Sequence, residues 1–171
     1  MLDLRLATAT DIPALHRLIE RAYRGESARA GWTHEADLLR GPRTNAAELA
    51  ALIADPTQDF LLATEGAGTI IVACIAVSDR GGGRFYFGQL AVEPARQAEG
   101  LGRRMIAAAE DHARARGGQT MELTVIDDRR PELVAYYERR GYAATGDRRP
   151  FPYELPISGP PLALFVMTRS L

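Results

Sequence analysis

Lysine is absent from this 171-residue sequence, and cysteine and tryptophan each occur once. The missing lysine excludes a Schiff-base nucleophile and a lysine general base. The single Cys74 cannot form an internal disulfide or, by itself, a cysteine-rich metal site, and its place in an apolar run predicts a buried, unreactive thiol. His16 and His112 have no partner at metal-ligand spacing, so the sequence predicts no metal site.

Long hydrophobic runs are missing as well. Apolar stretches such as residues 70–77 are far too short to cross a bilayer, and the first residues lack the basic and apolar regions of a signal peptide. The formal net charge is −1 and no basic stripe with interleaved aromatics is visible, so we expect no nucleic-acid and no membrane partner. The arginine-rich, lysine-free composition is typical of a GC-rich genome, and we expect a cytoplasmic bacterial protein.

What is present is an ordinary globular composition, with 46% hydrophobic and 25% charged residues. The length falls within the range of about 100–200 residues for one domain, so we expect a single domain over residues 1–171. Periodicity and turn residues predict strands at 2–6, 59–65, 69–78, 84–92, 120–126, from 142, and at 162–168. They predict helices at 12–22, 45–54, 100–117 and 131–140. The resulting order, βααβββαβαββ, is a mixed α/β fold.

The most informative segment runs from Leu90 to Met105 and is predicted as a strand, a short turn, a glycine pair and a helix. Glycines let a backbone approach a ligand closely, and the first N–H groups of a helix have no partner within it. This arrangement predicts a cradle for a phosphate or pyrophosphate, with positive charge from Arg96, Arg103 and Arg104 around it. A Walker motif is excluded because it requires lysine, and a dinucleotide fingerprint would require a third glycine near an early strand.

The residues Gln97-Ala98-Glu99-Gly100-Leu101-Gly102 match the Gln/Arg-x-x-Gly-x-Gly/Ala signature of the GNAT superfamily of acyl-CoA-dependent N-acyltransferases. Farther along, residues 135–142 (AYYERRGY) resemble that family's "LYEKLGF" segment. The predicted element order also resembles the family's order along the whole chain. The resemblance implies the GNAT fold, in which the strand before the signature splays away from its neighbour, and it implies acetyl-CoA as the co-substrate.

In that family the pantetheine arm lies in the gap between the splayed strands. The resemblance therefore implies that Leu90, Ala91 and Val92 contact pantetheine through their backbone. It implies that the pyrophosphate is held by backbone N–H groups over the signature together with one arginine. These residues are Gln97, Ala98, Glu99, Gly100, Leu101, Gly102 and Arg103. Where the family often has an asparagine that bonds pantetheine, this chain has Arg130, which could meet a CoA phosphate instead.

Tyr137 stands four residues before Gly141, at the position of the family's usual tyrosine. The resemblance implies that its phenol protonates the departing CoA thiolate. The alternative for this residue is a packed aromatic on an amphipathic helix, which is the role expected here for the adjacent Tyr136.

The general base is not indicated by any motif. Several relatives carry Glu or His six residues before the position of Val92, where this chain has Tyr86, and a phenol with a pKa near 10 is a poor base at neutral pH. An ordered water is one alternative, held by Glu122 and Thr124 on the next strand. His34 and Glu35 in the early loop are others.

In this family the acceptor pocket is built from the connection after the first helix and from the segment between the last two strands. Here those segments carry aromatic and charged side chains, and the candidate acceptor-binding residues are Tyr23, Trp32, Glu35, Tyr86 and Tyr153. Such a set suits an amine with an apolar or carboxylate-bearing body.

The sequence thus predicts an enzyme that moves the acetyl group of acetyl-CoA to a primary amine of a small-molecule or amino-acid-like acceptor by direct attack. Two alternatives stay open. The acceptor could be a protein N-terminus or lysine, or the chain could be a catalytically silent acyl-CoA-binding or sensor module. Homodimers are frequent in the family, and the sequence does not decide between a monomer and a homodimer.

Overall fold

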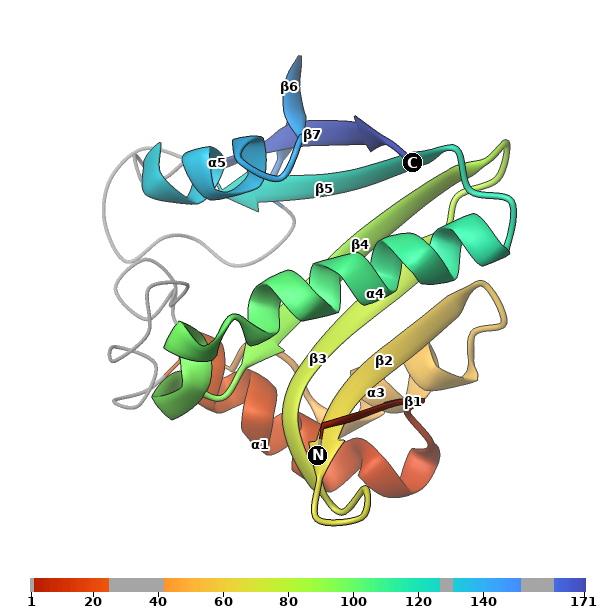
Figure 1. Cartoon of the computed structure of the whole chain (residues 1–171), viewed down its shortest axis with the longest axis vertical. Coiled ribbons are helices and arrows are strands. Elements are labelled where there is room, and N and C mark those ends of the chain that lie inside the picture. The colour runs from red at the N-terminus through yellow and green to blue at the C-terminus, as the bar shows by residue number, and fades with distance from the viewer. Residues whose placement is uncertain (1, 25–41, 127–130, 152–161) are drawn as a thin grey trace.

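The computed structural model describes residues 2–24, 42–126, 131–151 and 162–171 (Figure 1). Its strands are β1 (Asp3–Leu6), β2 (Gln58–Glu65), β3 (Ile70–Asp79), β4 (Arg84–Val92), β5 (Thr120–Ile126), β6 (Ala143–Pro150) and β7 (Ala163–Ser170). Its α-helices are α1 (Ile12–Tyr23), α3 (Ala46–Ala54), α4 (Leu101–Ala115) and α5 (Pro131–Glu138). Two 3-10 turns, η1 (Ala9–Asp11) and η2 (Pro94–Glu99), precede α1 and α4.

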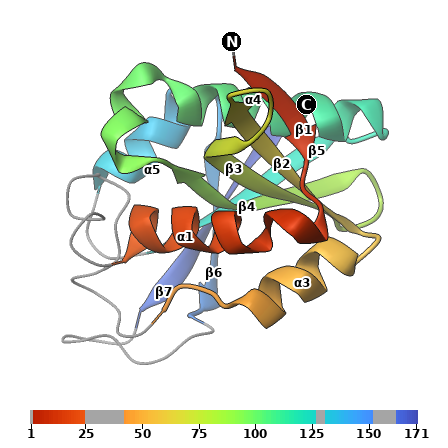
Figure 2. The ribbon, with the colours of Figure 1, turned by 90° about the horizontal axis from the view of Figure 1, so that it is seen from below.

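The described strands form one seven-stranded mixed sheet in the order β1-β2-β3-β4-β5-β7-β6. Within it β4 and β5 are parallel, and the other neighbouring pairs are antiparallel. Helices α4 and α5 lie on one face, and α1 and α3 lie on the other (Figures 1 and 2). This architecture confirms the mixed α/β fold class expected from the sequence.

The sequence pattern of each element explains which face it buries. Residues 71–77 of β3 are buried without alternation, because helices cover both faces of the sheet at this strand. In α1 the fully buried residues Leu15, Leu18, Ile19 and Ala22 follow helical spacing and form one stripe. Two apolar clusters result, one between the sheet and α4 with α5, and one between the sheet and α1 with α3.

The neighbouring strands β4 and β5 part soon after they begin (Figure 1). Their register covers Arg84–Tyr86 of β4 against Thr120–Glu122 of β5 and no further. On its other side β4 contains an extra residue relative to β3, since the register steps from Cys74↔Ala91 to Ala76↔Gly88. Gln89 takes a positive φ of 50° at this β-bulge. A bulge bends and twists its strand, so the bulge accounts for the divergence of β4 from β5.

Strand β6 is the element that the sequence described least well. The pattern predicted a short strand, whereas the structure has eight residues, all of them exposed. Because both faces of this edge strand are exposed to solvent, its sequence has no alternation of apolar and polar residues from which its length could be predicted. Strand β7 likewise extends to Ser170, two residues past its predicted end, where it still pairs with Thr120.

A buried carboxylate ties α4 to the last two strands. Glu110 is 5% exposed, and its Oε1 accepts a 2.8 Å hydrogen bond from the hydroxyl of Tyr142. One guanidinium nitrogen of Arg169 lies 2.9 Å from each of its carboxylate oxygens. Burial is the main cause of the raised pKa of Tyr142, followed by its bond to Glu110. The cluster fixes α4 against the part of the sheet that lies beyond the parting strands.

We expect Glu110→Ala to lower the free energy of unfolding by about 3 kcal/mol, because it leaves a buried phenol and a half-buried guanidinium without their acceptor. Urea denaturation followed by circular dichroism measures the change. Glu138→Ala, at an exposed position on α5, is the matched control and should stay within about 0.5 kcal/mol of the parent. Equal losses in the two variants would contradict a special role for Glu110.

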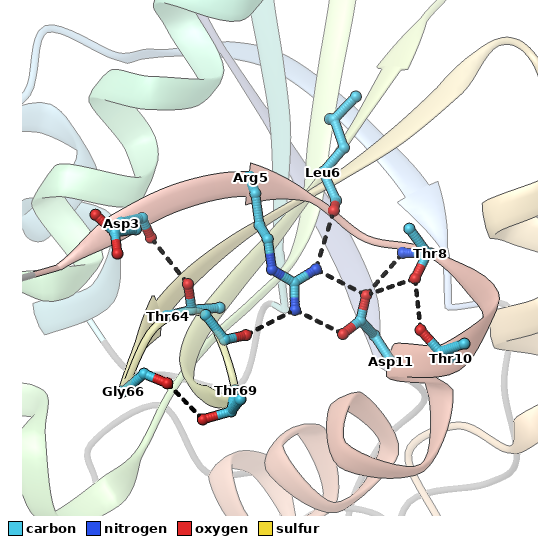
Figure 3. Close-up of polar contacts among 10 residues, drawn as sticks. Asp3, Arg5, Leu6, Thr8, Thr10, Asp11, Thr64, Gly66 and Thr69 are labelled. Carbon is cyan, nitrogen blue, oxygen red and sulfur yellow. Dashed lines mark hydrogen bonds and ion pairs between the residues drawn. The ribbon is translucent and has the colours of Figure 1, made fainter.

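A second ion pair holds the edge strand β1 to the start of α1 (Figure 3). The two terminal nitrogens of Arg5 reach the two carboxylate oxygens of Asp11 at 2.8 and 2.7 Å. Asp11 also accepts from the backbone N–H of Thr8 at 2.8 Å, and Arg5 donates to the carbonyl of Gly68 in the β2–β3 turn. These bonds, with that from Arg5 contributing most, lower the pKa of Asp11 to about 2.

This lowered pKa predicts an acid-dependent contribution to stability. Since the carboxyl group binds its proton more weakly in the folded chain, the contribution is complete above about pH 5 and is lost as the pH falls through about 2. Because the Arg5 side chain is 34% exposed, we expect it to amount to roughly 1–2 kcal/mol. Denaturation of parent and Asp11→Asn between pH 5 and pH 2 should show their difference shrinking with acidity. A difference that stays constant over this range would contradict the assignment.

Candidate active site

A pocket of about 190 Å³ opens where β4 ends and α4 begins, with α5 as its opposite wall. Its lining residues are Leu90, Val92, Gln97, Ala98, Gly100, Gly102, Arg103, Leu133, Tyr136, Tyr137 and Arg140. The pocket therefore joins three segments that are far apart in the sequence, namely the free end of a strand, a glycine turn and a helix. Eight of the predicted site residues are among its walls.

The floor of the pocket is the start of α4. Gly100 caps this helix with a positive φ of 75° and, having no side chain, forms no side-chain cap to the first-turn N–H groups. In the part of the chain that the structure describes, no heavy atom beyond the two chain neighbours comes within 4 Å of where a Cβ of Gly100 would stand. At Gly102, in contrast, a Cβ would come within 3.1 Å of the Tyr136 hydroxyl. Uncapped N–H groups at the positive end of a fifteen-residue helix suit an anion.

The arginines near this turn do not share one role. Arg103 lines the pocket, and Arg104 is exposed. Arg96 instead forms ion pairs with Glu65 at 2.7 Å and with Glu99 at 2.5 Å. Its positive charge is thus balanced by two carboxylates, and Glu99 is turned toward Arg96 and does not line the pocket. The expected contribution of Arg96 to an anion site is correspondingly small.

Tyr137 is 8% exposed and packs in an aromatic cluster with Phe87, Tyr136 and Tyr142, at ring-centroid distances of 5.3–6.1 Å. Burial raises its pKa strongly, and the neighbouring tyrosines add to the shift. The phenol therefore keeps its proton throughout the physiological pH range. Within the described part of the chain its hydroxyl has no hydrogen-bond partner, while its side chain reaches the pocket wall.

Sequence reasoning missed three pocket residues on α5 and in the turn directly after it. Leu133, Tyr136 and Arg140 line the same pocket as Tyr137. Arg140 stacks its guanidinium 3.4 Å from the ring centre of Tyr136 and donates to the backbone carbonyl of that residue at 2.6 Å. The four positions follow the spacing i, i+3, i+4, i+7, so helical periodicity around Tyr137 was the signal that could have found them.

Two of the residues predicted from the family resemblance turn their side chains into the core. Ala91 is buried on the face covered by α1, and Leu101 is buried under α4. Any contact that they make with a bound molecule in the pocket must therefore run through the backbone, as the family resemblance implied for Ala91.

The opposite face of the sheet carries the polar residues near the point where the strands part. There the hydroxyl of Tyr86 lies 3.0 Å from that of Thr124, bridging β4 and β5. Tyr23, at the end of α1, donates its hydroxyl proton to the carbonyl of Leu90. The predicted residues Trp32, Glu35, Arg130 and Tyr153, together with His34, lie outside the described residues.

Across residues 2–24, 42–126, 131–151 and 162–171, no three His, Cys, Asp or Glu side chains gather in a way that could hold a metal ion. No helix in these ranges is both long and apolar enough to cross a membrane.

Comparison with known structures shows the same fold over nearly the whole chain. The ribosomal-protein-S18-alanine N-acetyltransferase of Escherichia coli is 18% identical, with 99% of this chain and 94% of that chain covered and a TM-score of 0.74. A spermidine N-acetyltransferase chimera from Vibrio cholerae and hSSAT is 19% identical, with coverages of 99% and 95% and a TM-score of 0.72. The yncA protein of Salmonella typhimurium, whose structure includes its cofactor acetyl-CoA, is 17% identical, with coverages of 99% and 94% and a TM-score of 0.70.

A comparison with curated protein sequences gave no significant match. The family model described as "Acetyltransferase (GNAT) family", however, matches residues 12–142, about three quarters of the chain. This segment includes β4, the glycine turn, α4 and Tyr137, which are the parts that build the pocket. The chain belongs to the GNAT acetyltransferase family.

Proposed function

We propose that this protein transfers the acetyl group of acetyl-CoA to a primary amine of a small-molecule or amino-acid-like acceptor. The observation that carries the proposal is the single pocket that joins the free end of β4, the uncapped start of α4 and Tyr137. An anion cradle, a strand edge and a protonated phenol are the three elements that an acyl-CoA transferase needs in one place.

The residues around the pocket fit the chemical parts of acetyl-CoA. Backbone groups of Leu90, Ala91 and Val92 would pair with the amides of the pantetheine arm, because among the described residues no strand pairs with β4 on that side beyond Tyr86. The pyrophosphate would lie on the N–H groups of the signature residues 97–102, with Arg103 beside them. Arg130 remains a proposed contact to a CoA phosphate.

Acetyl-CoA supplies an activated thioester, which the neutral amine of the acceptor attacks directly. A backbone N–H of β4 near Val92 would polarise the thioester carbonyl. Tyr137 would give its proton to the departing sulfur. Because its pKa is raised, the phenol still carries that proton when the reaction begins. Cys74 is unsuited as a nucleophile, because burial raises the pKa of its thiol to about 12 and it packs in the cluster on the other face of the sheet.

The proton released by the amine needs an acceptor near the end of the β4–β5 pairing. Tyr86 and Thr124 carry hydroxyls there, and Glu122 lies opposite Tyr86 on β5. A water held by these groups is the route that we propose, since Tyr86 itself is a weak base. Tyr23 also belongs to this side of the site, because its hydroxyl donates to the carbonyl of Leu90, a residue that lines the pocket.

We expect Tyr137→Phe to lower kcat by about 10²–10⁴-fold, the range usual for loss of a general acid. The dissociation constant for acetyl-CoA should change less than about threefold, because the ring and its packing remain. Thiol release from acetyl-CoA over a panel of amines, paired with calorimetric titration of acetyl-CoA, measures both quantities.

The control for Tyr137→Phe is Tyr142→Phe, which removes a buried hydroxyl from the same aromatic cluster but outside the pocket. It should lose stability while keeping kcat. Unchanged kcat in Tyr137→Phe would contradict its role as the acid. Binding of acetyl-CoA without thiol release for any amine would favour the silent sensor, and release with peptides alone would favour a protein acceptor.

We expect Gly102→Val to weaken acetyl-CoA binding at least tenfold, which corresponds to about 1.4 kcal/mol. A branched side chain at this position would press on the Tyr136 hydroxyl and fill the floor of the pocket. Ala115→Val, an exposed position at the far end of α4, is the control for the cost of a β-branched residue in this helix. Equal affinity in the two variants would show that the start of α4 does not hold the cofactor.

A further inference from the structure

The last paired step of β4 and β5 places Tyr86 opposite Glu122. Both side chains lie on the face that α4 and α5 do not cover, because the alternating residues Phe85, Phe87, Met121 and Leu123 all belong to the cluster under those helices. Helix α1 packs over β3 and β4, and α3 packs over β2. Glu122 is therefore a carboxylate at the fork of the strands, on the side away from the CoA pocket.

Glu122 is paired with an arginine from the edge of the sheet. Its Oε1 lies 2.8 Å from Nη1 of Arg149 on β6. The side chains are 19% and 49% exposed, so the pair is shielded at the carboxylate and open to solvent at the guanidinium. The closest contact joins one carboxylate oxygen to one guanidinium nitrogen, and a carboxylate and a guanidinium each have capacity for further hydrogen bonds.

Two more groups border this pair. The ring of Tyr86 lies over Gly88, where a Cβ would come within 3.1 Å of it, and its hydroxyl meets Thr124 at the fork. The guanidinium of Arg80 stacks on the other part of the ring, 5.0 Å from its centre. Arg80, Arg149 and Glu122 thus surround a phenol that points toward the parted strands, and Asp147 adds a second carboxylate close to Arg149.

We propose that Glu122 and Arg149 form the recognition pair for the acceptor and that this acceptor is a zwitterionic amino acid. Its carboxylate binds the open edge of the Arg149 guanidinium, and its amino group binds the free oxygen of Glu122 beside Tyr86. The inference rests on the proposed function, which it deepens by naming the class of acceptor.

The dimensions and the charges of the pair support this choice. The opposite charges of Glu122 and Arg149 lie 2.8 Å apart, and an α-amino acid likewise carries its ammonium and carboxylate close together. The amino acid can therefore bind Glu122 and Arg149 at once while the ion pair between these two residues stays intact. A polyamine offers no carboxylate to the open edge of the Arg149 guanidinium and so cannot form that contact. Sites built to bind a polar group reject analogues that lack it, since the site group is left unpaired.

The experiment compares each α-amino acid with the amine obtained by removing its carboxyl group, for example phenylalanine with phenethylamine, and includes spermidine and a short peptide. Thiol release from acetyl-CoA gives kcat and KM for each acceptor. We expect at least one amino acid to exceed its matched amine tenfold or more in kcat/KM. Arg149→Gln should abolish that ratio by raising the KM of the amino acid while the KM of acetyl-CoA stays unchanged.

Arg148→Gln is the matched control, because Arg148 is the preceding residue on β6 and stacks over Phe165 at 4.4 Å instead of pairing with Glu122. It should leave the ratio intact. Glu122→Gln should raise KM for the amino acid and for its matched amine alike, since both use the same amino contact. Circular dichroism of each variant confirms that the sheet edge is folded.

The outcomes separate the inference from the proposed function. Turnover with spermidine, peptides or simple amines in preference to every amino acid, or an unchanged ratio in Arg149→Gln, overturns the inference and leaves the acetyltransferase in place. If no acceptor releases thiol, the proposed function fails, and calorimetric titration of the amino acids into protein with CoA decides the inference. Binding that Arg149→Gln removes supports it, and absence of binding in the parent protein overturns it.

Discussion

The parting of β4 from β5 after three paired residues is the constraint on which the rest of the site depends. A sheet that continued its pairing would satisfy the backbone groups of β4 within the protein and would leave no strand edge for a ligand. The bulge at Gln89 bends β4 away, and the cluster of Glu110, Tyr142 and Arg169 keeps α4 fixed to the strands on the far side of the gap. The opening is thus maintained by packing and ion pairing at its two borders.

The elements bordering this opening were predictable because each carries a strong local signal. The bounds of β4 and β5 agree with the prediction at both ends, since β4 is bordered by a glycine run and a proline and β5 alternates strictly. The glycine turn before α4 was predictable for the same reason. The family resemblance, built on Gln97–Gly102 and Tyr137, is confirmed by the family model and by the fold of known structures.

The remaining features depend on contacts that sequence does not display. The ion pair between Arg96 and Glu65 follows from the approach of the end of β2 to η2, which no spacing in the sequence indicates. The full length of β6 could not be predicted, because an exposed edge strand has no alternation of apolar and polar residues. The ion pair between Arg149 on β6 and Glu122 could not be predicted for the same reason. The roles of individual site residues stay predictions, including those of Trp32, Glu35, Arg130 and Tyr153 outside the described part of the chain.

The two faces of the sheet differ in how well they tolerate substitutions. The phenol of Tyr137 belongs to the same buried cluster that holds the sheet to α4, so substitutions around it alter stability and geometry together. The polar groups on the other face sit at the fork and on a solvent-exposed edge strand, where replacements cost little folding energy. Under the proposed function, substitutions along this outer edge can therefore change the acceptor without destabilising the protein. The residues around Tyr137 are constrained twice, by acetyl transfer and by the stability of the fold.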